Sequence, residues 1–172
     1  MNIVIDAQVV SWYLAESLGA TTPATESPDA LFERLGGEDT AFVDEGGQIQ
    51  HEWRSVTDAD WFDQWFGELL VSGAIVIVEA QACRALLTHL HGNLGFPRSR
   101  DVWYIRTAAG VGHAIGLPVG LVTEDMDFYD PPSKVCTPGR RARILAGCSG
   151  SVARHLRREG ILVRSLIAHC SA

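Results

Sequence analysis

Five acidic residues stand where carboxylates could gather around a metal ion. Asp6 closes a short apolar run at residues 2–5, and Asp125 and Asp127 follow a second strand-like run at residues 119–123. Because ligands of an open α/β sheet bind beyond the carboxyl ends of its strands, these acids are expected at that edge. Carboxylates held together repel one another unless a cation joins them, and oxygen ligands favour hard ions such as Mg²⁺ or Mn²⁺. The pattern therefore predicts a metal-dependent active site.

The other two acids, Glu52 and Asp101, lie in segments with helical periodicity. Each has a simpler explanation than metal binding, since Glu52 fits a solvated helix face and Asp101 fits the favourable end of a helix dipole. The carboxylate of Asp125 could likewise serve only to cap the next helix. His51 adjoins Glu52, but adjacent helical residues face different directions, so at most one of the two is expected in the site.

Strands and helices alternate along the chain, and this alternation sets the fold class. Short β-branched runs predict strands over residues 3–6, 41–44, 75–78, 119–123 and 161–166. Apolar periodicity and capping residues predict helices over residues 9–18, 27–35, 48–56, 57–70, 80–90, 101–112 and 151–159. Such alternation implies right-handed crossovers and a mostly parallel, Rossmann-like central sheet in a three-layer α/β/α fold.

The segments between these elements are predicted to be loops. Residues 20–29 are polar and contain Pro, residues 92–100 contain Gly and Pro, and residues 131–139 are bounded by Pro without a pattern of their own. The sequence shows no internal repeat. A length of 172 residues fits one domain with a sizeable core, so we expect a single domain over 1–172.

Positive charge is scarce but concentrated in one part of the chain. The net charge of −7 argues against a generally basic nucleic-acid-binding surface, although not against a local one. Of the 14 basic residues, 13 are Arg, and six of these lie within residues 140–158. We expect Arg154, Arg157 and Arg158 to hold substrate phosphates through bidentate contacts, with a solvated helix face as the competing interpretation.

Nothing in the sequence directs the chain to a membrane. There is no basic-then-apolar leader, and no apolar run approaches the roughly 18 residues that span a bilayer. The cysteines lack the paired C-x-x-C spacing of a zinc site; they are Cys83, Cys136, Cys148 and Cys170. We therefore expect reduced thiols and a cytoplasmic location. Phosphate-binding P-loop, dinucleotide-binding and acyl-hydrolase motifs are all missing from the sequence.

Taken in order, four segments resemble the motifs of PIN domains, a family of small metal-dependent nucleases that includes the toxins of many bacterial toxin–antitoxin pairs. The segments are IVIDA at residues 3–7, QHEW at 50–53, DVWYIRTA at 101–108 and LVTEDMDF at 121–128. Each motif is short, and the resemblance rests on their number and order over roughly residues 1–130. It implies a Rossmann-like parallel sheet and an endonuclease, with single-stranded RNA as the expected substrate.

The resemblance also implies roles for individual residues. It assigns the metal ligands and catalytic acids to Asp6, Glu52, Asp101 and Asp125, with Asp127 assisting as a further ligand and Thr123 as a polar contact near the substrate. The cofactor would be Mg²⁺ or Mn²⁺, which would polarise the scissile phosphate for in-line attack by water. An antitoxin or another regulatory protein, and a second copy of the chain, are the expected protein partners.

Two other functions remain open. A metal-dependent phosphohydrolase acting on small phosphate esters would need similar acids, but haloacid-dehalogenase-like enzymes carry a second Asp where this chain has Gln8. A non-catalytic PIN-like module could instead bind RNA or a protein. Clustered negative charge favours catalysis over binding alone, because a binding site gains nothing from it.

Overall fold

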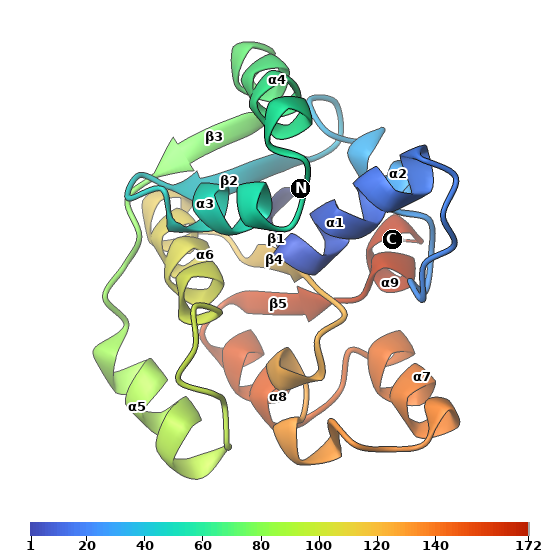
Figure 1. The fold of residues 1–172 in the computed structure, drawn as a ribbon. Helices are drawn as coiled ribbons and strands as arrows, with labels where there is room; N and C mark the ends of the chain where they lie inside the picture. Colours follow the sequence, from blue (N-terminus) through green and yellow to red (C-terminus); the bar gives the residue numbers. More distant parts are fainter. Residues whose placement is uncertain (172) are drawn as a thin grey trace.

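A five-stranded, all-parallel sheet forms the centre of the molecule, as seen in a computed structural model that describes residues 1–171 (Figure 1). The strand order is β3-β2-β1-β4-β5, with β1 in the middle. The strands are β1 (Asn2–Ile5), β2 (Thr40–Asp44), β3 (Ile75–Val78), β4 (Val119–Val122) and β5 (Ile161–Arg164). All five strands predicted from the sequence are therefore confirmed, with shifts of one or two residues at their ends.

Helices flank the sheet, which confirms the predicted three-layer α/β/α fold. They are α1 (Ala7–Ser17), α2 (Pro28–Phe32), α3 (Gln48–Ser55), α4 (Ala59–Val71), α5 (Arg84–Asn93), α6 (Val102–Ile115), α7 (Pro138–Ala146), α8 (Ser151–Arg158) and α9 (Leu166–Cys170). Helix α6 packs on β1, β2 and β4, and α8 packs on β5. Among residues 1–171, no helix is both long enough and apolar enough to cross a membrane. All four cysteines are free thiols.

The two central strands are buried on both sides, as expected for a parallel sheet covered by helices. The side chains of Ile3, Val4 and Ile5 in β1 are completely buried, and so are those of Leu121 and Val122 in β4. This burial explains why these runs are continuously apolar instead of alternating. It also fixes the position of whatever follows each strand, because the strands themselves cannot shift without exposing the core.

The chain reverses direction across the sheet between β1 and β4. From β1 it moves outward through β2 to β3, and it then returns to the other side of β1 to form β4. The pairing of Ile5 with Val122 brings the carboxyl ends of β1 and β4 side by side, and Asp6 N donates to Val122 O at 3.0 Å. Ligands of open α/β sheets bind at such a switch point. The switch point of this sheet therefore lies where the first and last groups of acids emerge.

The helix predicted over residues 80–90 begins only at Arg84. The segment before it bonds to α6 instead of coiling: Gln81 N donates to Arg106 O at 3.0 Å, and the Arg106 side chain returns a bond to Gln81 O at 2.9 Å. Gly110 in α6 permits this approach, because a Cβ there would lie 2.1 Å from Glu79 O. The periodicity of the sequence contains no signal for such a tertiary contact.

Two helices were not predicted. Helix α7 occupies the end of the predicted loop 131–139 and continues beyond it; the Thr137 side chain caps it by accepting from Arg140 N, and Pro138 takes its first position. Only Leu145 is buried in this helix, so its apolar pattern is weak. The strand predicted to reach Leu166 ends at Arg164, because the Ser165 hydroxyl accepts from Ala168 N and starts α9. The short helix predicted over 27–35 likewise ends early, at Phe32.

Candidate metal centre

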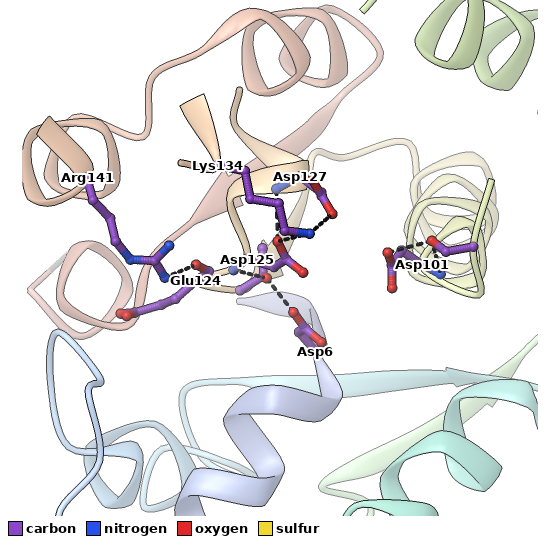
Figure 2. Close-up of polar contacts among 9 residues, drawn as sticks. Asp6, Asp101, Glu124, Asp125, Asp127, Lys134 and Arg141 are labelled. Carbon is purple, nitrogen blue, oxygen red and sulfur yellow. Dashed lines mark hydrogen bonds and ion pairs between the residues drawn. The ribbon is translucent and has the colours of Figure 1, made fainter. Parts of the chain in front are cut away.

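Three carboxylates converge beyond the carboxyl end of β4. Asp101, Asp125 and Asp127 each offer one oxygen, and these oxygens all lie within 4.8 Å of one another. Asp127 is buried and the other two side chains are half-buried. In Figure 2, Asp101 at the start of α6 faces Asp125 and Asp127, which lie in the segment that follows β4. The three side chains could hold a metal ion.

The geometry of the β4 segment explains how two of the acids reach the same point. The Thr123 hydroxyl accepts a hydrogen bond from Asp125 N at 3.0 Å, and Asp125 Oδ1 accepts from Asp127 N at 2.9 Å. The second bond starts the 3₁₀ turn η1 (Met126–Phe128). Capping was the competing interpretation for Asp125, and the residue does cap this turn. A carboxylate has two oxygens, however, so capping through Oδ1 leaves Oδ2 for a ligand.

Asp101 is the N-cap residue of α6 but makes no capping hydrogen bond with its side chain. Its carboxylate instead accepts from the Ser99 hydroxyl at 2.6 Å. Burial raises the pKa of Asp101, and the charges of Asp125 and Asp127 raise it further. A carboxylate that only capped the helix would gain nothing from lying close to two other carboxylates. Capping therefore does not explain the position of the Asp101 side chain.

Asp6 lies at the end of β1 and is 7% exposed. One oxygen accepts from Gln8 N at 3.3 Å and so caps α1, and the other accepts from the Thr123 hydroxyl at 2.5 Å. Burial raises the pKa of Asp6 to about 7, opposed by these hydrogen bonds and reinforced by the charges of Asp125 and Asp101. In the metal-free protein, Asp6 therefore holds its proton well above the pH at which an ordinary Asp ionises.

Helix α3 carries Glu52 to the same crevice. The helix starts at the end of β2, where the Asp44 carboxylate accepts from Gln48 N at 2.9 Å and from Ile49 N at 2.8 Å. It is then fixed to β1 by the buried Trp53 indole, which donates to Ile5 O at 3.1 Å. The neighbour of Trp53 in sequence is consequently held beside the end of β1.

The Glu52 side chain is held in turn by Tyr104, whose hydroxyl donates to Oε2 at 3.0 Å. The same hydroxyl accepts from Ala7 N at 3.1 Å, so it links Glu52 to the residue that follows Asp6. Burial raises the pKa of Glu52, and the charge of Asp101 adds to the effect. His51 is exposed, which agrees with the expectation that only one of the two adjacent residues faces the site.

These acids share one cavity of about 360 Å³. Its lining residues are Asp6, Ala7, Gln8, Ser11, Trp12, Glu52, Val56, Asp101 and Asp125. All four residues assigned as catalytic by the family resemblance therefore lie around the same space, and Asp127 joins it through the carboxylate cluster. A larger cavity of about 490 Å³ lies beside the end of α6. It is lined mainly by small and apolar residues and contains none of the predicted acids.

Two residues of the segment that follows β4, Glu124 and Thr123, have structural roles instead. The Glu124 side chain is completely buried and accepts from Thr25 N at 3.1 Å and Leu166 N at 3.3 Å, so it anchors the predicted loop 20–29 to the start of α9. Figure 2 shows it directed away from Asp101. Thr123 was expected to contact the substrate. It is completely buried, and its hydroxyl is engaged by Asp6, so it positions the acids instead.

Three residues near the centre were not predicted from the sequence. Lys134 places its ammonium 2.5 Å from Asp127 Oδ2 and 4.0 Å from Asp125 Oδ1. Tyr104 and Trp12 line or support the cavity from helices where aromatic residues are ordinarily core. The one available signal was composition, because Lys134 is the single lysine of the chain.

The predicted phosphate-binding arginines face two different clefts. Arg154 and Arg158 line a cleft of about 250 Å³ between α8 and α5, together with Leu94, Ser151, His155 and His89. The rings of His155 and His89 stack there, with centroids 4.3 Å apart. Arg157 lines a separate cleft with Cys148 and Arg164. The three arginines therefore form no single patch.

Comparisons with known proteins give no assignment for this chain. A scan against models of protein families finds no match, and searches of curated proteins and of solved structures find no significant match. The functional argument consequently depends on the residues and their geometry.

The raised pKa of Asp6 predicts a pH-dependent stability in the metal-free protein. The unfolded chain releases this proton near pH 4 and the folded chain near pH 7, so the folded state binds the proton more tightly and loses stability as pH rises between these values. Asp6→Asn removes that loss. Relative to wild type, the variant should gain on the order of 2 kcal/mol of unfolding free energy between about pH 5 and pH 8.

Urea unfolding in the presence of a chelator measures this difference. Asp60→Asn is the matched control, because Asp60 is exposed in the first turn of α4. The unfolding free energy of Asp60→Asn should differ from that of wild type by the same amount at every pH in this range. A gain for Asp6→Asn that is the same at both ends of the pH range would contradict the burial of an ionisable Asp6.

Proposed function

We propose that this chain is a metal-dependent endonuclease of the PIN type that hydrolyses phosphodiester bonds, with single-stranded RNA as the substrate. The observation that carries the proposal is the convergence of Asp6, Glu52, Asp101 and Asp125 on one cavity from four different elements. Burying and grouping like charges costs stability, and perturbed carboxylates in a cleft are typical of functional sites. Their order along the chain is the order of the PIN motifs.

The chemistry of the donor set favours Mg²⁺ or Mn²⁺. The three residues of the cluster are all carboxylates, which suit hard cations, whereas a zinc site normally includes His or Cys. An ion held by Asp101, Asp125 and Asp127 supplies Lewis-acid activation of a phosphate and of water. Asp6 supports these three ligands indirectly, through its charge and its hydrogen bond to Thr123.

Glu52 is the best-placed proton acceptor for the attacking water. Its bond to Tyr104 uses Oε2, which leaves Oε1 for a ligand in the cavity. Burial raises the pKa of this carboxyl, and a raised pKa makes a carboxylate a better base near neutral pH. Water would add to phosphorus as the bridging oxygen leaves, with the proton passing to Glu52. No nucleophilic side chain is required.

The cleft between α5 and α8 is a suitable path for the rest of the RNA strand. Among residues 1–171, neither Arg154 nor Arg158 takes part in an ion pair, although the chain carries a net charge of −7. The start of α8 contacts the segment just after the acid cluster, where Val152 N donates to Tyr129 O at 3.0 Å. Although Arg154 Nε donates to Gly150 O at 3.1 Å, guanidinium groups without a carboxylate partner can bind successive phosphates through their other N–H groups.

A phosphohydrolase of small phosphate esters is the second candidate. The acidic cavity, at about 360 Å³, is within the range of small-molecule pockets, so a compact ester would also fit. Both candidates use the same acids and differ in the size of the substrate. An antitoxin-like regulatory partner and pairing with a second copy are further proposals that follow from the family resemblance alone.

The activity is tested by incubating the purified protein with single-stranded RNA and Mn²⁺ or Mg²⁺. Cleavage should require the metal. It should fall by about tenfold to a hundredfold in Asp6→Asn, the usual cost of changing a neighbour of a metal ligand, and by more in Asp125→Asn, which removes a ligand charge. Glu52→Gln should lower turnover with little effect on RNA affinity. Asp60→Asn is the matched control and should cleave normally.

Metal-dependent cleavage that survives Asp6→Asn, Glu52→Gln and Asp125→Asn together would overturn the site assignment. Turnover of an aryl phosphate without RNA or DNA cleavage would favour the phosphohydrolase. RNA binding without cleavage under any metal would favour a non-catalytic module.

The substrate path predicts a change in salt dependence. Each phosphate contact to a single strand contributes about 0.7 to the slope of log affinity against log salt, so Arg154→Gln with Arg158→Gln should flatten that slope by about 1.4. Binding is measured in a chelator, so that RNA stays intact. Arg157→Gln should have a smaller effect, because Arg157 lines a different cleft. Arg54→Gln is the control, since Arg54 pairs with Asp63 at 2.9 Å; an equal loss of slope there would contradict the path.

A further inference from the structure

Lys134 brings a positive charge into the carboxylate cluster. Its ammonium donates to Asp127 Oδ2 at 2.5 Å and lies 4.0 Å from Asp125 Oδ1 (Figure 2). Both acids belong to the group of three that could hold a metal ion. The ammonium therefore bonds to one carboxylate of this group and lies close to a second. Neither the sequence motifs nor the proposed chemistry gives this lysine a role.

The turn that presents Lys134 is fixed on both sides. Its backbone N–H donates to Pro131 O at 3.0 Å at the end of η2 (Pro131–Ser133). The Ser133 hydroxyl donates to Asp130 Oδ2 at 2.5 Å and accepts from the Arg140 guanidinium at 2.8 Å, which ties the turn to α7. The position of the ammonium is thus set by the fold around it, although the Lys134 side chain is 58% exposed.

Asp130 also connects this turn to α8, because its other oxygen accepts from the Ser151 hydroxyl at 2.9 Å. Gly150, just before α8, has φ of 141° and approaches Tyr129 so closely that a Cβ would lie 2.1 Å from Tyr129 O. These contacts fix both ends of the segment that runs from the acid cluster to Lys134. Lys134, Asp125 and Asp127 therefore lie on one segment that is held at both ends.

The charge balance shows what the ammonium does there. Three carboxylates within 4.8 Å of one another repel, and Lys134 offsets part of that repulsion when no metal is bound. A lysine ammonium is charged at neutral pH, so the metal-free cluster holds this positive charge beside Asp127. A divalent ion entering the cluster must displace the ammonium from Asp127 or share this carboxylate with it. Either route makes metal binding weaker than the acids alone would allow.

We propose that Lys134 is an internal cation that competes with the divalent ion for Asp127 and Asp125, and so raises the metal concentration at which the site fills. This inference rests on the metal centre of the proposed function and concerns its regulation. It gives the protein a stable acidic site without metal and makes occupancy depend on the free metal concentration. An incidental surface ion pair, by contrast, would leave metal affinity unchanged.

Isothermal titration of Mn²⁺ into the metal-free protein, without nucleic acid, tests the inference. Lys134→Met should lower the dissociation constant by about fivefold, the factor expected for removing one partly exposed ion pair. Its melting temperature without metal should fall, and the rise on adding Mn²⁺ should be larger than in wild type. Lys134→Arg keeps the charge and should bind Mn²⁺ much as wild type does.

Arg143→Met is the matched control, because it removes one positive charge from an exposed position on α7. It should leave Mn²⁺ affinity unchanged. Equal affinity of Lys134→Met and wild type, or an equal gain in Arg143→Met, would overturn the role of Lys134 and leave the metal centre standing. Absence of Mn²⁺ binding in wild type and in Lys134→Met would overturn both the role of Lys134 and the metal centre.

Discussion

The parallel pairing of β1 with β4 is the interaction on which the acidic site depends. Its last rung, from Asp6 N to Val122 O at 3.0 Å, sets the end of one strand beside the end of the other. Asp6 and Thr123 are the next side chains along, and the hydroxyl of one binds the carboxylate of the other. Two segments more than a hundred residues apart in sequence thereby become one wall of a cavity. The buried apolar residues of both strands keep this register from slipping.

Around that pairing, the protein maintains an arrangement that electrostatics opposes. Burial raises the pKa of Asp6, Glu52 and Asp101, so each charge is held at a cost. Hydrogen bonds from Thr123 and Tyr104, and the charge of Lys134, offset part of it. Natural chains tolerate such local conflict chiefly at functional sites. A bound cation would resolve this conflict most simply, and this is the physical basis of the proposed metal centre.

Much of the fold could be predicted because its signals are local. The run at residues 2–5 and the run at 119–123 are apolar and β-branched, and the alternation with helices indicates a parallel sheet. The start of α5 could not be predicted in this way, since it depends on a backbone contact between Gln81 and Arg106. Helix α7 was missed for a different reason: three of its nine residues are arginine and only Leu145 is buried, so its apolar pattern is weak.

The site shows the same division between local and long-range information. The family resemblance assigned Asp125 and not Glu124 to the site, and in the structure Asp125 lines the cavity whereas Glu124 faces the loop. Adjacent positions after a strand differ by their side of the backbone, and the turn at Thr123 decides which side is which. No sequence pattern predicted the role of Lys134, because that role depends on the folded turn at η2. Arg154, Arg157 and Arg158 of α8 were predicted to act together because they are close in sequence. In the structure, Arg157 lines a different cleft from the other two.

The most direct test of the metal centre is a crystal structure of the protein grown with Mn²⁺, with data collected to locate manganese by its anomalous scattering. Our account predicts one strong peak bounded by carboxylate oxygens of Asp101, Asp125 and Asp127. Ordered acids without a peak between them, or manganese bound only elsewhere, would contradict it.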